Sequence, residues 1–125
     1  MAEKREKAYR YGLRAERIAA WYLRAKGYRV LAERYRNHQG EIDILATKSG
    51  TLVAVEVKAR KTLELCEETI TPMKQQKISR AISGLLGGQG KIAGLTLASN
   101  PNIRFDVIWI APGRWPRHLK DAWRL

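Results

Sequence analysis

The chain has 125 residues, and its 24 Lys and Arg against 12 Asp and Glu give a formal net charge of +12. This length supports a single domain over residues 1–125, because two domains would each be too short to form an adequate hydrophobic core. A hydrophobic fraction of 45% excludes a disordered polycation, while the charged first residues and the absence of an 18-residue apolar run argue against a signal peptide and a membrane span, so we expect a cytoplasmic protein.

The first predicted element is a helix over residues 4–26, where apolar residues recur every three or four positions and Gly27 follows as a terminating glycine. The opposite side of this helix is a basic row that also contains Trp21. The row consists of Lys7, Arg10, Arg14, Arg17 and Arg24. A row of one sign suits a phosphate backbone, so we expect it to bind nucleic acid; an ordinary solvated face is the alternative. The Ala- and Gly-rich side suits packing on a sheet and disfavours a membrane partner.

Three strands are predicted next, at residues 28–35, 41–47 and 51–60. The glycine of Ser49-Gly50 allows a tight turn that joins the second strand to the third. A second helix is predicted to begin with Thr71 as N-cap and Pro72 as its first residue.

The second helix is expected to end at Gly87-Gly88. Residues 92–98 and 103–111 are predicted as two further strands, and residues 115–125 as one or two helical turns. The resulting order α-β-β-β-α-β-β predicts an α/β fold with a mixed central sheet and helices packed on it.

The second and third strands carry the residues that point most clearly to chemistry. Period-two alternation places Glu56, Lys58 and Arg60 on one face of the third strand, and predicts that Ile42 and Ile44 share a face of the second. With a two-residue turn the numbers of paired residues sum to 99. Asp43 then faces Glu56, and Glu41 faces Lys58, unless a bulge intervenes.

Two carboxylates opposed on neighbouring strands repel each other unless a cation compensates. The single cysteine and two distant histidines exclude a Cys/His metal site, which leaves oxygen ligands and a hard cation, Mg²⁺ or Mn²⁺. A cation held by Asp43 and Glu56 can polarise a phosphodiester and acidify a water, while Lys58 orients that water or stabilises the transition state. The alternative is a solvated salt-bridge face.

Gly40-Glu41-Ile42-Asp43, followed by Val55-Glu56-Val57-Lys58 and Arg60, resembles the D…ExK core of the PD-(D/E)XK nuclease superfamily. More narrowly, the chain resembles the YraN-type family of small bacterial proteins, described as related to Holliday-junction resolvases. Further matches are Gly12, Glu16, Gly27-Tyr28, Thr71-Pro72, Lys74-Gln75, Arg104-Phe105-Asp106-Val107, His118-Leu119 and Ala122-Trp123. The resemblance implies a restriction-endonuclease-like fold.

The resemblance also implies roles for individual residues. Asp43, Glu56 and the main-chain carbonyl of Val57 would be metal ligands, with Glu16 as a third or outer ligand. Without the resemblance, Glu16 is interpreted as a rim residue paired with an arginine of its own helix. Lys74 and Gln75 would reach the site or a phosphate, a solvated helix start being the alternative.

The expected function is that of a divalent-metal-dependent endonuclease that acts on structured or branched DNA and leaves a 5′-phosphate. Besides the first-helix row, Arg60, Lys74 and Gln75 are expected to bind the nucleic acid, and resolvase-like relatives imply a homodimer. One alternative is a non-catalytic nucleic-acid-binding module that keeps the nuclease fold. Another is an assembly factor for a ribonucleoprotein, which would prefer RNA.

Three further expectations concern single side chains. Asp106 is predicted to form a structural ion pair with Arg104, and Trp109 is predicted to lie in the core. The other tryptophans are expected to pack, with base stacking or a dimer seam as alternatives. These tryptophans are Trp21, Trp115 and Trp123.

Overall fold

The computed structural model describes residues 2–61, 70–88 and 102–124. Its elements are α1 (Ala2–Ala25), β1 (Arg29–Asn37), β2 (Gly40–Lys48), β3 (Thr51–Ala59), α2 (Pro72–Leu86), β4 (Asn102–Ile110) and β5 (Arg117–Trp123). The strands form one sheet in the order β1-β2-β3-β4-β5, with β3 and β4 parallel and the other neighbours antiparallel. This confirms the predicted α/β fold with a mixed sheet.

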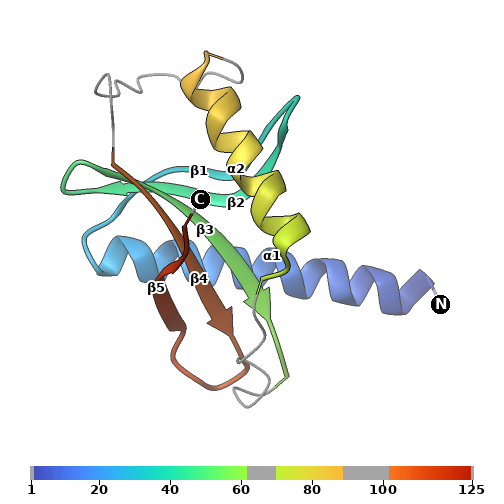
Figure 1. Ribbon diagram of the computed structural model, residues 1–125. Coiled ribbons are helices and arrows are strands. Elements are labelled where there is room, and N and C mark those ends of the chain that lie inside the picture. The colour runs from blue at the N-terminus through green and yellow to red at the C-terminus, as the bar shows by residue number, and fades with distance from the viewer. Residues whose placement is uncertain (1, 62–69, 89–101, 125) are drawn as a thin grey trace.

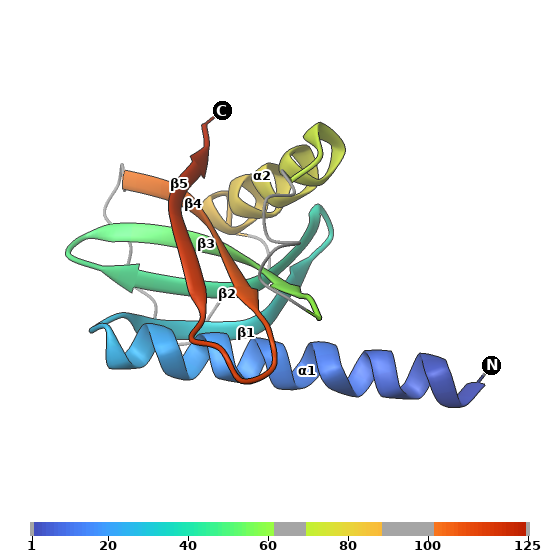
Figure 2. The same cartoon turned by 90° about the horizontal axis from the view of Figure 1, so that it is seen from below.

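The two helices cover opposite faces of this sheet, so the chain forms three layers (Figures 1 and 2). On the α1 side, Ala15, Ala19 and Leu23 recur at four-residue steps and pack fully buried against Ile44 and Val55 of the sheet. The N-terminal half of α1 extends past the sheet (Figure 2). No helix in the described ranges is long and apolar enough to cross a bilayer.

On the other face, α2 begins as the sequence predicts. Thr71 is the N-cap, and its side chain accepts a hydrogen bond from the main-chain N–H of Lys74 at 3.2 Å. The helix packs Ile78 and Ile82 against a core that contains Trp109, whose predicted burial is confirmed. Glu56 and Lys58 alternate with residues buried under α1, so their side chains lie on the α2 side of the sheet.

The prediction of helical turns at residues 115–125 is wrong, because residues 117–123 form strand β5 along the free edge of β4. The register shifts opposite Asp106, and the displaced Asp121 has a φ of 55° and donates its main-chain N–H to the Asp106 carboxylate at 3.0 Å. Because of this bulge, the residues of the strand do not follow a period-two pattern in the sequence. The strand predicted at residues 92–98 and Cys66 lie outside the described residues.

Candidate functional site

The ladder between β2 and β3 ends close to the predicted site residues. It runs from the turn at Ser49 and Gly50, both with positive φ, to the pair Ile44 and Val55, and over this length the predicted sum of 99 is confirmed. The expected Asp43 to Glu56 and Glu41 to Lys58 pairs are not part of this ladder. Glu41 instead pairs with Arg36 of β1. Beyond Ile44, β2 and β3 therefore diverge, and we call this opening the fork.

The fork arises from a bend in the β1–β2 hairpin. Arg34, at the level of Asp43 in β1, has a φ of 57°, which is uncommon for a residue other than glycine. Ile42 packs on the α2 side of the sheet and Ile44 on the α1 side, so the prediction that they share a face is wrong. The pairing of β1 with β2 keeps its register on both sides of Arg34, so the change of face at this level occurs without a bulge. The end of the hairpin consequently lies against α2 (Figure 1).

The Asp43 carboxylate lies in the fork. Its Oδ2 accepts a hydrogen bond from the main-chain N–H of Val57 at 2.8 Å, and its carboxyl group is hydrogen-bonded to that of Glu56. Arg60 donates its N–H to Ile110 of β4, so strand alternation directs both main-chain polar groups of Val57 toward the fork. The expected meeting of Asp43 and Glu56 thus occurs through side chains rather than through the register.

Glu56 is 4% exposed and is the most perturbed carboxyl group of the site. Burial, the charge of Asp43 and the hydrogen bond that protonated Glu56 donates to Asp43 raise the pKa of Glu56 to about 8, against the opposing effect of Lys74 and Lys58. The Lys58 Nζ lies 3.9 Å and the Lys74 Nζ 3.8 Å from Glu56 Oε1. At neutral pH Glu56 therefore keeps its proton, even with two ammonium groups nearby.

Of the two residues predicted at the start of α2, only one reaches the carboxylates. Lys74 does so through its ammonium group. Gln75 turns back and donates from Nε2 to the main-chain carbonyl of Ile70 at 2.8 Å, which closes the first turn of the helix. The geometry thus favours Lys74 over Gln75 as a contributor to the site.

Glu16 lies near the fork but is engaged elsewhere. Its Oε2 is 3.2 Å from Arg34 Nε, so Glu16 is a rim glutamate paired with arginine, but the partner lies on β1 and not on its own helix as expected. Burial and the charge of Asp43 raise its pKa, and Arg34 opposes them. Within residues 2–61, 70–88 and 102–124 no three His, Cys, Asp or Glu side chains form a group that could hold a metal ion. The site therefore offers two converging carboxylates with a third nearby.

The basic row of α1 is exposed as expected, and it lies on the layer opposite α2. Trp21 within the row is 58% exposed, and Trp115 is 75% exposed, so the expectation of packing is wrong for these two. Trp123 is buried and stacks on Phe105 with ring centroids 5.1 Å apart. Arg60 lies at the end of β3, where its main-chain carbonyl accepts from the Tyr11 hydroxyl at 3.1 Å.

A second polar cluster, which the sequence predicted only in part, surrounds the fully buried Asp106. Arg104 forms the predicted ion pair with it, with Nε at 2.8 Å, and His118 Nε2 lies at the same distance. Burial alone would raise the pKa of Asp106, but hydrogen bonds from His118, Arg104 and Asp121 lower it to about 2. Lys26 completes the chain at 2.8 Å from His118 Nδ1. Nothing in the spacing of His118 indicates this role.

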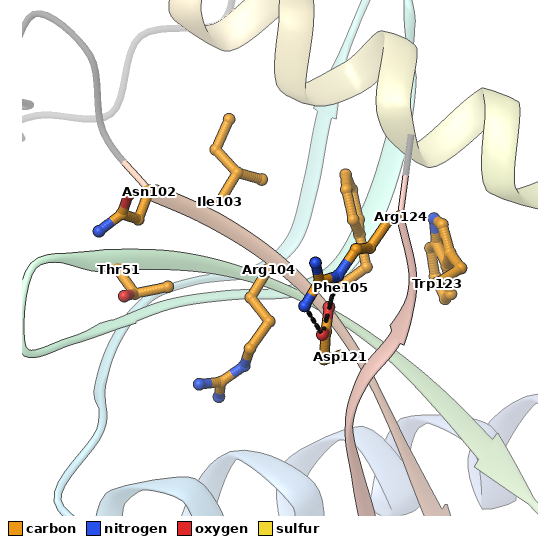
Figure 3. A pocket seen from close by; sticks show the side chains of 8 residues that line it. All are labelled: Thr51, Asn102, Ile103, Arg104, Phe105, Asp121, Trp123 and Arg124. Carbon is orange, nitrogen blue, oxygen red and sulfur yellow. Dashed lines mark hydrogen bonds and ion pairs between the residues drawn. The ribbon is translucent and has the colours of Figure 1, made fainter.

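This Asp106 cluster connects α1 to the β4–β5 edge rather than to the fork. Arg104 also lines a cavity of about 440 Å³ that is shaped by the start of β4 and the end of β5 (Figure 3). Across that cavity Arg124 and Asp121 form an exposed ion pair at 2.7 Å. The carboxylate of Asp106 is satisfied by its partners, and it lies on the α1 side of the sheet, whereas Glu56 of the neighbouring strand lies on the α2 side; both observations favour a structural role for the cluster.

Comparisons with known proteins converge on one family. The model of the uncharacterised protein family UPF0102 matches residues 15–110. A UPF0102 protein of Parvibaculum lavamentivorans is 48% identical over 117 residues, which cover 94% of this chain and 84% of that protein. One of Rhodopseudomonas palustris is 48% identical over 121 residues, covering 97% and 88%, and one of Caulobacter vibrioides is 42% identical over 116 residues, covering 93% and 88%.

Proposed function

This chain belongs to the UPF0102 family, the YraN-type family that its sequence resembles, and we propose that it is a divalent-metal-dependent endonuclease that hydrolyses structured or branched DNA. The observation that carries the proposal is the contact between the Asp43 and Glu56 carboxyl groups in the fork, beside two lysine ammonium groups. A buried pair of acids with a raised pKa costs stability, and perturbed groups of this kind cluster at functional sites.

The donor set fits Mg²⁺ or Mn²⁺. These ions take oxygen ligands, and Mg²⁺ in particular is bound through one or two carboxylates while it keeps several waters. Asp43, Glu56 and the carbonyl of Val57 would supply the protein oxygens, all from the fork. Glu16 would be an outer ligand. Its carboxylate is close enough to Asp43 for that charge to raise its pKa, but it is already paired with Arg34.

A bound divalent ion supplies polarisation of a phosphoryl oxygen and a more acidic water. The other contributions come from side chains of the protein. Glu56 must release its proton before it can serve as a ligand, and Asp43 keeps its position because Val57 holds one of its oxygens. Lys58 would orient the attacking water or neutralise charge on the phosphate, and Lys74 would do the same from the start of α2. A 5′-phosphate product is what the resemblance implies.

The proposed substrate surface consists of cationic side chains outside the fork. The row of Lys7, Arg10, Arg14 and Arg17 would contact phosphates away from the scissile bond, together with Arg60 at the end of β3. Gln75 contributes by fixing the helix start that carries Lys74. A homodimer would let two such sites act on the two strands of a branched substrate.

A non-catalytic nucleic-acid-binding module is the second candidate. It is favoured by the two ammonium groups that already face Glu56, since they lessen the repulsion between the carboxylates without a metal ion. In such a module the fork would serve only to shape the surface.

Incubation of the purified protein with labelled four-way junction, flap and single-stranded DNA, in Mg²⁺, Mn²⁺ or EDTA, separates the two candidates. The nuclease predicts metal-dependent cleavage of at least one substrate that is lost in Glu56→Gln and Lys58→Ala. Asp121→Asn, which removes an exposed carboxylate of β5 outside the fork, is the matched control and keeps cleavage. Equal activity in all variants would identify a contaminating enzyme and remove the case for the fork.

A further inference from the structure

A groove of about 560 Å³ lies between the β1–β2 turn and α2. We call it the α2 groove. The charged side chains and the histidine that line it are Arg36, His38 and Glu41 from the hairpin and Lys74, Lys77 and Arg80 from the helix. Since Lys74 also faces Glu56 at 3.8 Å, the groove and the fork are continuous on the same side of the sheet.

The α2 groove is rigid, because the hairpin turn is fixed to the helix. The side-chain amide of Asn37 donates to the main-chain carbonyl of Ala81 at 2.9 Å. Gly40 lies so close to α2 that a Cβ atom there would come within 2.6 Å of the Lys77 carbonyl oxygen, and a Cβ on Gly84 would come within 2.8 Å of Asn37. A ligand therefore meets a formed groove and loses little free energy to ordering it.

The charges of the α2 groove match a polyanion. Four of its side chains carry a permanent positive charge, and its one carboxylate, Glu41, is neutralised by Arg36 at 3.2 Å. Lys74, Lys77 and Arg80 follow one another at three-residue steps, so they cover about 9 Å of the helix. Successive phosphates of one B-form strand advance by roughly 3.4 Å, so two or three of them can face this row.

We infer that the α2 groove binds the sugar-phosphate backbone of the substrate strand next to the scissile phosphate. This inference rests on the proposed function and deepens it, because it assigns the side from which the strand reaches Glu56. The strand approaches on the α2 layer, between helix and hairpin. The basic row of α1, on the opposite layer, then meets a more distant part of the nucleic acid.

The test is binding of a labelled four-way junction and a labelled single strand, measured in EDTA so that no cleavage intervenes. The groove variant is Lys77→Ala with Arg80→Ala, and the control variant is Arg29→Ala with Lys120→Ala, which removes the same charge from exposed sites outside the groove. Two lost phosphate contacts predict roughly tenfold weaker binding and a plot of log K against log salt that is shallower by about 2 for the groove variant. The control changes both quantities by much less.

Glu41→Gln gives an effect of opposite sign, since it removes the only carboxylate among the residues that line the groove and releases Arg36. It is expected to tighten binding at least twofold. Equal weakening by the groove and control variants would overturn the inference by showing that only net charge matters. Weakening confined to Arg14→Ala with Arg17→Ala would overturn it in favour of the α1 layer.

The two proposals fail separately. Cleavage with no effect of the groove variant on binding would leave the endonuclease and overturn the groove. Loss of binding in the groove variant with no cleavage of any substrate would support the groove and overturn the endonuclease. Because Lys77 and Arg80 are exposed, the variants are expected to keep the melting temperature of the wild type, which is measured alongside.

Discussion

The main-chain N–H of Val57 donates to the side chain of Asp43 at 2.8 Å, where an antiparallel neighbour would otherwise accept it. The carboxylate thus replaces a strand at the point where β2 leaves β3, and its second oxygen remains for other partners. The same side chain therefore closes the sheet and builds the site. This dual role makes the two chemical variants of Asp43 behave differently.

Asp43→Asn keeps an acceptor for Val57 and removes the negative charge, whereas Asp43→Ala leaves that N–H without its partner. We expect Asp43→Ala to lower the free energy of unfolding by about 1–3 kcal/mol relative to Asp43→Asn. Both variants are expected to lose metal-dependent cleavage. Chemical denaturation at constant pH measures the difference, and equal stability of the two variants would mean that the hydrogen bond contributes nothing.

The raised pKa of Glu56 predicts how stability changes with pH in the absence of metal. The folded protein holds this proton up to about pH 8, while the unfolded chain releases it near 4.5, so the folded state binds more protons in between. Stability therefore falls as the pH rises from about 5 to 8. Glu16, whose pKa is also raised, acts in the same direction.

Glu56→Gln removes most of this pH dependence and is expected to stabilise the metal-free protein at pH 8 by a few kcal/mol. Urea unfolding of the wild type and the variant at pH 5, 6.5 and 8 measures the effect. Asp106 does not interfere, because its pKa is lowered to about 2 and its contribution is lost only in strong acid. A wild type whose stability rises across this window would contradict the assignment.

Metal binding should be linked to the same proton. Deprotonated carboxylates are the ligands, so the Mg²⁺-induced rise in melting temperature is predicted to be larger at pH 8 than at pH 6. At a concentration one hundred times the dissociation constant, a single site adds about 2.7 kcal/mol. Calorimetric titration in buffers of different ionisation enthalpy measures proton release. Glu56→Gln serves as the control, and a metal response independent of pH would be evidence against binding at Glu56.

Lys58 and Lys74 are predicted to affect turnover more than metal binding. Removal of either ammonium group takes a counter-charge away from Glu56, so its pKa rises further and cleavage shifts to higher pH. At saturating metal, Lys58→Ala is expected to reduce the cleavage rate by about 100-fold or more. Single-turnover rates across pH 6–9 measure this effect, with Lys48→Ala at the opposite end of β2 as control. A rate lost only through weaker metal binding would contradict a role of Lys58 in the chemical step.

The Asp106 cluster is predicted to support stability alone. Asp106→Asn leaves the buried Arg104 contact without its counter-charge and weakens the bond to His118, so it should cost about 3–5 kcal/mol. Cleavage by the fraction that stays folded is expected to match the wild type. Thermal unfolding and a rate normalised to folded protein distinguish this from a catalytic role, which would show as a lower normalised rate at low temperature.

The sequence predicts those parts of the fold that depend on local geometry. Ser49 and Gly50 define the turn and, through it, the register up to Ile44 and Val55. Thr71 and Pro72 define the start of α2 for the same reason, since a cap and its first turn involve neighbouring residues.

The remainder depends on contacts between residues distant in sequence. The fork lies beside Arg34 of β1, and a positive φ in an arginine has no signature in the sequence. The bulge in β5 depends on Asp106, fifteen residues earlier. The sequence therefore predicts that Asp43 and Glu56 meet by pairing across the strands, whereas the structure brings them together through their side chains.

The central claim is that Asp43 and Glu56 hold a divalent ion that cleaves DNA. Its most direct test is the single-turnover rate of junction or flap cleavage against Mg²⁺ concentration, for wild type, Glu56→Gln and Asp121→Asn. We predict a saturable Mg²⁺ dependence in the wild type and Asp121→Asn, and a rate at least 1,000-fold lower, roughly 4 kcal/mol, in Glu56→Gln. Cleavage by Glu56→Gln at the wild-type rate would contradict it.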